Sequence, residues 1–258
     1  MVKIIFSLLI ICLIVFPFSG SAKSEEAEST SDRVARILKE LDDLYRSKSS
    51  HGFISMQVRT IHYTRTLRME FWSRGKDKSL IRILSPLKEK GTATLMSGKN
   101  IYTYLPKTDR TIRLSSGMMG GSWMGSHFTN DDLVKESRMS EDYDATITFE
   151  GERDGEFIIE FTLIPRPLAA VVWGKIVSTI RAEDKNPLTY IFYDEDMEIA
   201  RTMVFRKVKD LGGRMIPSVL RVTPADKSDE YTEVIYENIK FDILIEDSFF
   251  SIARLKKK

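Results

Sequence analysis

Most of the chain after residue 53 alternates between apolar and polar residues, and turn sequences interrupt this alternation at short intervals. Leu67, Met69 and Phe71, for example, alternate with the charged residues Arg68 and Glu70. Turn sequences follow at residues 74–77, 85–86, 97–100 and 106–109. Side chains of a β-strand alternate between the two faces of its sheet, so the pattern predicts short antiparallel strands. A long series of such strands predicts a mainly β fold whose sheet curls or closes.

The expected strands can be placed by residue number. They lie at 53–60, 67–72, 80–84, 92–96, 101–105, 111–114, 143–150, 157–163, 172–181, 188–194, 199–208, 216–223 and 231–243, with a short end at 249–253. A helix is expected before them, capped by Ser31 or Asp32. Its apolar stripe follows helical spacing: Val34, Ile37, Leu38, Leu41, Leu44 and Tyr45. Neither a repeat nor a linker divides these segments, so we predict one domain at residues 31–258.

The first residues predict export rather than folded structure. Lys3 precedes an apolar run at residues 4–16, Pro17 ends the run, and small residues fill positions 20–22. This order is typical of a cleaved secretory signal peptide, which we place at residues 1–22 with cleavage after Ala22. The apolar run is shorter than the roughly 20 residues that span a bilayer. A lead-in rich in Ser and Glu, expected to be disordered, follows at residues 23–30.

Composition narrows the possible functions. The only cysteine, Cys12, lies in the predicted signal peptide, so the mature chain has no disulfide or thiol chemistry. The 39 basic and 37 acidic residues nearly balance, which gives no reason to expect a nucleic acid as partner.

The stretch at residues 113–133 differs from the strands around it. Met118 and Met119 are followed by two glycines, and then by Trp123, Met124 and Phe128. Large apolar side chains on a backbone with adjacent glycines suit a movable flap over an apolar pocket. The alternative is a loop whose side chains simply fill the core.

Some of the predicted strands are apolar or aromatic on both faces. Ile101, Tyr102 and Tyr104 fall in one such strand, and Tyr190 and Phe192 in another. A sheet with one face in water alternates more clearly. The pattern therefore favours a cup with an apolar interior, although aromatic strands also occur in ordinary packed cores.

Several short motifs resemble a known family. They are FWSRG at 71–75, IRILSP at 81–86, KGT at 90–92, YTYLP at 102–106, SWMGSHFTNDDL at 122–133, GRMIP at 213–217 and FFS at 249–251. Together they resemble the outer-membrane lipoprotein-sorting protein family, within the LolA/LolB-like superfamily of periplasmic lipoprotein carriers. The similarity extends over nearly the whole mature chain. His127 departs from the pattern, because an acidic residue is expected at its position.

The resemblance implies a half-open antiparallel β-barrel with helices plugging its mouth. It also implies a periplasmic carrier that binds acyl chains of a lipoprotein or lipid in an apolar cavity and moves them toward the outer membrane. An inner-membrane transporter would be a further partner. From strand parity and the central stretch we expect these cavity residues: Trp72, Ile81, Ile83, Met96, Tyr102, Tyr104, Met118, Met119, Trp123, Met124 and Phe128.

Two other function classes stay open at this stage. One is a non-catalytic periplasmic subunit that docks on a membrane transporter through its sheet edge. The other is a hydrolase, for which His127 with Asp131 would supply a metal-ligand pair, although Asn130 and Asp131 also suit the cap of a helix that begins near Asp132. The motifs G-x-S-x-G, HExxH and the P-loop do not occur. We therefore expect a protein without catalytic residues, metal or cofactor.

Overall fold

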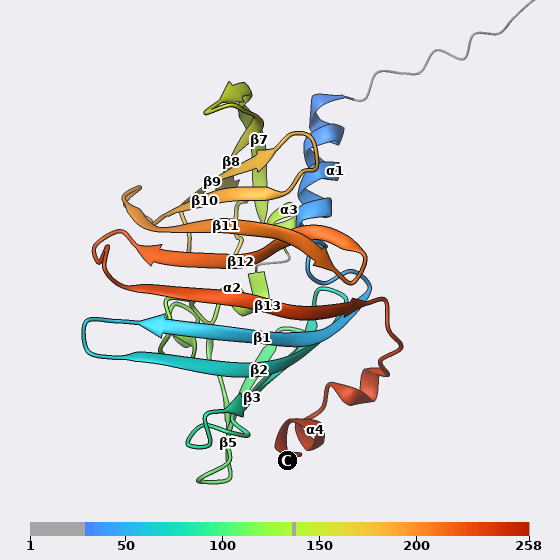
Figure 1. The fold of residues 1–258 in the computed structure, drawn as a ribbon, viewed down its shortest axis with the longest axis vertical. Helices are drawn as coiled ribbons and strands as arrows, with labels where there is room; N and C mark the ends of the chain where they lie inside the picture. The colour runs from blue at the N-terminus through green and yellow to red at the C-terminus, as the bar shows by residue number, and fades with distance from the viewer. Residues whose placement is uncertain (1–28, 136–137, 258) are drawn as a thin grey trace, which may run out of the picture.

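Thirteen strands form one antiparallel sheet in the computed structural model, which describes residues 29–135 and 138–257 (Figure 1). The predicted signal peptide and most of the predicted lead-in lie outside these described residues. The strands are β1 (Ser49–Arg59), β2 (Thr64–Arg74), β3 (Lys78–Ser85), β4 (Ala93–Ser97), β5 (Asn100–Leu105), β6 (Arg110–Arg113), β7 (Tyr143–Arg153), β8 (Glu156–Pro165), β9 (Lys175–Arg181), β10 (Pro187–Tyr193), β11 (Ile199–Leu211), β12 (Arg214–Pro224) and β13 (Tyr231–Phe241).

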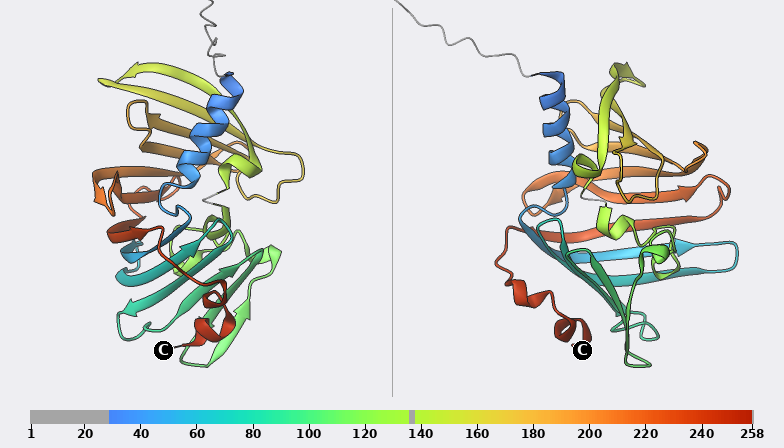
Figure 2. Two further views of the ribbon diagram at one scale, coloured as in Figure 1. Left: turned by 90° about the vertical axis from the view of Figure 1, so that its right-hand side faces the viewer. Right: turned by 180° about the vertical axis from the view of Figure 1, so that it is seen from behind.

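The sheet is open, with β6 at one edge and β7 at the other. Its order is β6-β5-β4-β3-β2-β1-β13-β12-β11-β10-β9-β8-β7, so all but one neighbouring pair is consecutive in sequence. The exception is β1 with β13, which brings the two ends of the strand series together at the centre of the sheet. The strongly curved sheet forms a cup, and the predicted mainly β, half-open fold is confirmed (Figure 2).

Helix α1 (Thr30–Asp42) lies across the concave face of the sheet. Its stripe of Val34, Ile37, Leu38 and Leu41 is buried in the main apolar cluster, together with side chains from β1, β2 and β8–β13. Ser29 caps the helix by accepting a hydrogen bond from the backbone N–H of Asp32. The predicted caps, Ser31 and Asp32, are therefore wrong by two to three residues, because Ser29 already supplies a hydroxyl at the first turn. The part of the chain that the structure describes contains no helix long and apolar enough to cross a membrane.

A buried carboxylate at the end of α1 holds a second helix in place. Asp42 is 3% exposed, and it accepts hydrogen bonds from the backbone N–H groups of Met139 (3.0 Å) and Ser140 (3.1 Å). These residues begin the short helix α3 (Met139–Asp142), whose first N–H groups have no partner within the helix. Lys76 Nζ lies 3.4 Å from the same carboxylate. One side chain thus joins α1, α3 and the turn between β2 and β3.

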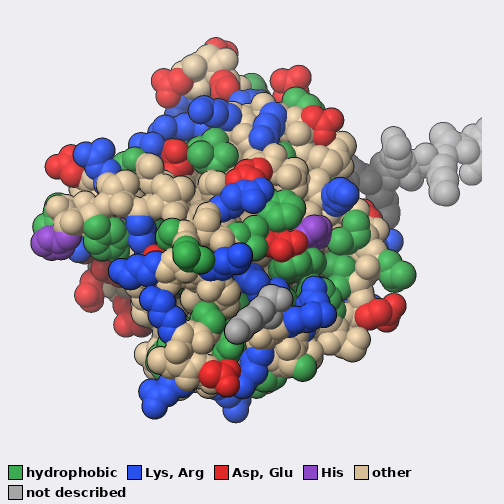
Figure 3. Space-filling model, turned by 60° about the horizontal axis from the view of Figure 1, so that its bottom comes forward, with side chains coloured by type: hydrophobic (Ala, Val, Ile, Leu, Met, Phe, Trp, Pro, Cys, Tyr) green, Lys and Arg blue, Asp and Glu red, His purple; other side chains and the backbone are tan. Residues whose placement is uncertain are grey.

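The convex face is covered in part by the end of the chain. A 3-10 turn, η3 (Asp247–Phe249), and the helix α4 (Ile252–Lys256) place Ile245, Phe250 and Leu255 against the outer side of β2–β5. The short strand predicted at 249–253 is therefore wrong. Ser251 instead caps α4 by accepting a hydrogen bond from the Arg254 N–H. A strand here would have to pair with an edge of the sheet, whereas a helix can pack on the apolar outer side chains without such pairing. On the lower face, Lys and Arg side chains are spread among apolar ones (Figure 3).

Removing the Asp42 carboxylate should loosen α3. Asp42→Ala is expected to lower the free energy of unfolding by about 1–2 kcal/mol, the usual range for a lost helix cap. Urea unfolding followed by tryptophan fluorescence measures this change. Equal stability of variant and wild type would show that α3 does not depend on Asp42.

The charge of Asp42 also predicts a pH dependence. Burial raises the pKa of this carboxyl above 3.8, so the folded chain holds the proton more tightly than the unfolded chain. Wild type should therefore lose stability relative to Asp42→Asn, an uncharged variant that keeps an oxygen acceptor, as the pH rises from 3.8 through the raised pKa. The same unfolding curves, recorded at several pH values, test the sign. A difference that is constant or grows in favour of wild type with rising pH would contradict the prediction.

Candidate functional site

The concave face contains an apolar cavity of about 120 Å³. Its walls come from β1–β3, β12 and β13, and its cover comes from the segment between β6 and α2 (Asp132–Lys135). The lining residues are Tyr45, Arg46, Ser50, Ile54, Phe71, Trp72, Ser73, Ser79, Ile81, Trp123, Phe128, Leu133, Leu220, Val234 and Tyr236. This volume is below that of a cavity of about 150 Å³ that holds one benzene. In this conformation the cavity is too small for a long acyl chain.

Strand register explains why the walls are apolar. Phe71 pairs with Ile81 across β2 and β3, and directly paired residues share a face. The same row leads from Phe71 to Gly52 on β1, where the carbonyl oxygen of Asn238, and next to it the Phe71 ring, leave no room for a Cβ. Every second residue of these strands therefore contributes to the concave wall, and the alternation seen in the sequence becomes an apolar lining.

Residues 114–131, which we call the central loop, cover this cavity. Trp123 is 5% exposed and inserts among the core side chains, where its indole Nε1–H donates to Thr94 Oγ1 at 3.1 Å. Phe128 lines the cavity beside it. A buried tryptophan usually finds a partner for its N–H, and here the partner lies on β4. The central loop is thus joined to the sheet at its most deeply buried residue.

The backbone of the central loop folds back on itself. Asn130 N–H donates to Gly121 O (2.9 Å), and Trp123 N–H donates to Phe128 O (2.8 Å). Met124 lies at φ 50°, a left-handed conformation that side-chain-bearing residues rarely adopt. Met124 thus lies between the two bridged positions of this fold-back, Ser122 and Thr129.

Two side chains at the rim bind the tip of the central loop. Arg65 donates from Nη2 to the carbonyl oxygen of Met124, and its Nη1 lies 3.1 Å from Glu89. Tyr63 donates from its hydroxyl to Gly125 O at 3.0 Å. Both ties reach backbone carbonyls, so they constrain the loop's path whatever side chains it carries.

His127 contacts β13 and the turn before it. Its Nδ1 lies 2.9 Å from Thr232 Oγ1 and its Nε2 lies 3.2 Å from Glu230 Oε2. Hydrogen bonds from the Ile61 N–H and from His127 lower the pKa of Glu230 below its ordinary value. The order hydroxyl, imidazole, carboxylate is that of a hydrolase triad. Thr232, however, is fully buried and also accepts the His127 backbone N–H, so it cannot reach a substrate.

The His127–Asp131 metal pair considered from the sequence is not formed. Both ring nitrogens of His127 lie within hydrogen-bond distance of Thr232 or Glu230. Within residues 29–135 and 138–257, no three His, Cys, Asp or Glu side chains are grouped as ligands for a metal ion. The helix α2 does begin at Asp132, but Thr129 rather than Asn130 or Asp131 supplies its cap: the Thr129 hydroxyl accepts the Asp132 N–H, and the Asp132 carboxylate accepts the Thr129 N–H.

A buried ion pair joins the end of the central loop to β11. Arg201, 4% exposed, makes two bonds to the Asp132 carboxylate, at 2.6 and 2.7 Å. It also donates to His127 O at 3.1 Å, and its guanidinium lies 4.3 Å from the Trp173 ring centroid and 4.2 Å from that of Phe192. The bidentate geometry and the aromatic rings compensate the cost of burying this charge.

Five of the predicted cavity residues lie on the concave side, around the cavity. Ile81, Trp123 and Phe128 line it directly. Ile83 belongs to the same buried cluster, and Met124 is partly buried against that cluster. The structure thus brings together residues from β3 and from the central loop, which are far apart in sequence.

Three predicted loop and strand methionines lie elsewhere. Met96 pairs with Ser79 and so shares the concave face, but it belongs with Met119, Ile101 and Leu114 to a separate small cluster away from the cavity. Met118 is 44% exposed at the surface. The methionine pair of the sequence therefore splits, with one side chain against β4 and β5 and the other in solvent.

Trp72, Tyr102 and Tyr104 correct the predicted face assignment. Trp72 borders the cavity, but its indole stacks on the convex side against His51, at 5.2 Å between ring centroids. Tyr102 and Tyr104 pack in the convex cluster with the end of the chain. The register gives the reason. Since Phe71 and Ile81 are direct partners, Trp72 must point to the other face, and a shift of one residue exchanges inside for outside.

Other cavity residues were not anticipated. Leu220, Val234 and Tyr236 line it from β12 and β13, and Tyr45 stacks on Tyr236 at 4.6 Å between ring centroids. Strand parity alone could have grouped Val234 with Tyr236. Their place beside β1 depends on the pairing of β1 with β13, which no local pattern reveals.

Further voids adjoin the cavity on the concave side. One of about 50 Å³ lies near Trp173 and Tyr190, and one of about 40 Å³ lies near Leu41 and Tyr45. The two voids share the lining residues Met139 and Tyr190. The void near Leu41 also shares Tyr45 and Arg46 with the main cavity. α1, α3 and the central loop thus divide one apolar trough into small compartments.

Comparison with known proteins places this fold. A family model described as "Uncharacterized protein" matches residues 75–257. A domain from Vibrio parahaemolyticus that is described as an outer membrane lipoprotein-sorting protein domain is 23% identical, with 86% of this chain and 98% of that chain covered and a TM-score of 0.76. A DUF1329 family protein from Desulfovibrio piger is 20% identical, with 88% and 99% covered and a TM-score of 0.79.

A LolA superfamily protein from Nitrosomonas europaea is also similar, with 21% identity, 88% of this chain and 99% of that chain covered, and a TM-score of 0.73. A search of curated proteins found no match. The TM-scores show that the chain has the LolA-type fold, which confirms the resemblance seen in the sequence.

Breaking the buried ion pair should be costly. Asp132→Asn leaves the Arg201 charge buried without its partner, and we expect a loss of about 3–5 kcal/mol in the free energy of unfolding. Arg166→Met is the matched control, because its pair with Asp144 is exposed, with side chains 48% and 71% accessible, and should cost at most about 1 kcal/mol. Chemical unfolding of both variants gives the comparison. Similar small losses in the two would mean that Arg201 does not anchor the central loop.

Proposed function

Since the chain belongs to the family whose model matches residues 75–257, and since it has the LolA-type fold, we propose that it is a carrier of acyl chains. In this proposal the protein works in the periplasm after removal of its signal peptide. It binds the acyl chains of a lipoprotein or lipid inside the cup and moves them toward the outer membrane. It performs this task by binding, without chemical turnover.

The observation that carries the proposal is the apolar cavity between the sheet and the central loop. A cavity with aliphatic and aromatic walls stabilises hydrocarbon, and each methylene removed from water contributes about 0.8 kcal/mol. The compartments along the concave face extend the same apolar surface beyond the main cavity. Together they mark a path that an acyl chain could fill.

Acyl binding requires the central loop to yield. The cavity of about 120 Å³ lies below the range of roughly 300–1,000 Å³ usual for small-molecule pockets. Trp123, Met124 and Phe128 occupy space next to it and would exchange contacts with the sheet for contacts with the cargo. Such an exchange replaces one apolar contact by another, so the net cost is small and loading can be reversible. The described conformation is then the closed, unloaded one.

Native mass spectrometry of the protein purified from its own compartment tests the proposal most directly. A carrier should retain a lipid or an acylated peptide, and the added mass identifies it. A fluorescent fatty acid added to delipidated protein should then bind and be displaced by that cargo. Protein that carries no lipid and binds no fatty acid would exclude the carrier function.

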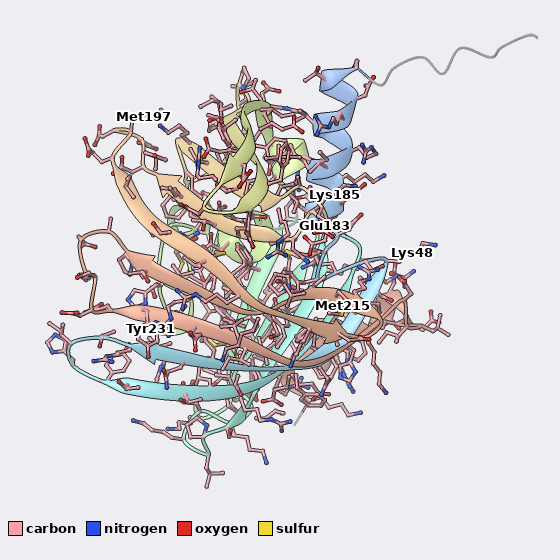
Figure 4. The ribbon with its side chains drawn as sticks, turned by 45° about the horizontal axis from the view of Figure 1, so that its top comes forward. Lys48, Glu183, Lys185, Met197, Met215 and Tyr231 are labelled. Atoms are coloured by element: carbon pink, nitrogen blue, oxygen red, sulfur yellow. The ribbon has the colours of Figure 1, made fainter. Side chains whose placement is uncertain are left out.

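A charged substitution separates a movable cover from ordinary core. Met124→Glu should weaken fatty-acid binding at least about tenfold, equivalent to 1.4 kcal/mol, because it places a carboxylate beside the apolar chain. Met197→Glu is the control: Met197 shares the left-handed backbone, with φ 64° against 50°, but is 51% exposed at the β10–β11 turn (Figure 4). If Met124→Glu instead unfolds the protein and its folded fraction binds like wild type, the central loop is core.

A further inference from the structure

Three serines form a polar row in the otherwise apolar wall of the cavity. Ser50 on β1 pairs with Ser73 on β2, and Ser73 pairs with Ser79 on β3. Directly paired residues share a face, so the three hydroxyls lie side by side on the concave face, and all three line the cavity. The neighbouring row on the same face, Phe71 with Ile81, is apolar.

Not every hydroxyl hydrogen of this serine row is used in a hydrogen bond within the row. Ser50 Oγ and Ser73 Oγ lie 2.6 Å apart, and the two residues are 0% and 3% exposed. One hydroxyl donates to the other, so the second keeps its own hydrogen. Among the described residues, Ser79 Oγ has no hydrogen-bond partner, and its residue is half-buried. Ser79 Oγ, unlike Ser178 Oγ, is not closed off from solvent, so an acceptor atom of a ligand in the cavity would accept its hydrogen in place of water.

The serine row lies at one end of the cavity, whereas the tip of the central loop lies outside the cavity lining, toward the other end of β2. Arg46 borders the cavity at the serine end, held by bonds from Nε to Gly75 O (3.1 Å) and from Nη2 to Lys78 O (3.0 Å). Lys48, labelled in Figure 4, precedes β1 at the same end. Along β2, Ser73 is eight residues from Arg65, which binds the loop tip, or roughly 26 Å at about 3.3 Å per residue.

We propose that the serine row binds the oxygen atoms of the acyl group, so that cargo lies with its carbonyl or carboxylate at Ser50, Ser73 and Ser79. The hydrocarbon then extends along Phe71 and Ile81 toward the central loop. This assignment rests on the proposed acyl-carrier function and adds to it an orientation and a substrate class. The preferred ligand carries a hydrogen-bond acceptor at its polar end, and a cationic head is disfavoured because Arg46 borders the cavity at the same end.

Competition against a bound fluorescent fatty acid tests the assignment on the mature protein. The competitors share one chain and differ at the head: dodecanoate, methyl dodecanoate and dodecylammonium. In wild type, dodecanoate or its ester should displace the probe about tenfold more effectively than dodecylammonium, as expected for one or two hydrogen bonds. Preference for dodecanoate over the ester points to a free fatty acid as cargo, whereas equal or better competition by the ester points to esterified acyl groups.

Serine-to-alanine variants locate the effect. Ser50→Ala with Ser73→Ala should reduce the preference for acceptor heads to less than about threefold. The milder Ser79→Ala, at a half-buried position, should reduce it in part and is used if the double variant does not fold. Ser178→Ala is the matched control: its hydroxyl is also buried on the concave face and has no partner in the described chain, but it does not line the cavity.

The outcomes separate this inference from the proposed function. If wild type binds no fatty-acid probe, the carrier function itself fails. If the probe binds but all heads compete equally, or if the serine variants keep the wild-type preference, the carrier function stands and the serine row is not the site of the acyl oxygens. The same loss of preference in Ser178→Ala would also overturn the assignment.

Discussion

The structure depends on covering the apolar concave face of an open sheet. β6 and β7 end the sheet on opposite sides and do not pair, so the sheet cannot bury its inner face by closing on itself. A sheet must bury its apolar face against another layer. α1, α3 and the central loop supply that layer, and their side chains join those of the strands in one buried cluster. The fold is therefore a cup-shaped sheet whose concave face is covered by these three elements.

The elements that fill the cup are fastened by polar contacts of unequal strength. Asp42 and Arg201 are almost fully buried, and each binds several groups, so α3 and the start of α2 are held firmly. At the rim, Arg65 and Tyr63 bind backbone carbonyls of the central loop at half-exposed or exposed positions. Water can replace such bonds at lower cost than buried ones. Among the elements that cover the concave face, the tip of the central loop is thus the part that can leave the sheet most easily.

The proposed carrier function is supported by the residues of the concave face rather than by the topology of the sheet. One fold can serve many functions, and the identities of 20–23% to the similar solved structures establish the fold alone. The concave face has a cavity with aliphatic and aromatic walls, a cover that contains Trp123 and Met124, and a row of serines at one end. An amphiphile has the same division into a hydrocarbon part and a polar end.

The amino-acid sequence by itself determined the class of the fold. Three local properties of the chain indicate this class: alternation with a period of two, turn residues between the alternating runs, and the helical stripe of α1. Short-range sterics and the burial of one face give each of them its structural meaning. The sequence also singled out the central loop, because a tryptophan and methionines near adjacent glycines do not suit a regular strand. The motifs shared with lipoprotein-sorting proteins pointed to the same cup.

Only the tertiary structure decided which face of each strand lines the cavity. Trp72 and Ile81 both belong to apolar strands, but the pairing of Phe71 with Ile81 sends the Trp72 indole to the convex side. Likewise, the chain's end became a helix over that convex side, and Val234 reached the cavity because β13 pairs with β1. Register and long-range pairing result from packing the whole sheet at once, and a slip of one residue exchanges inside for outside. Local sequence carries the period of a strand, whereas the position of that strand relative to its neighbours is a property of the assembled sheet.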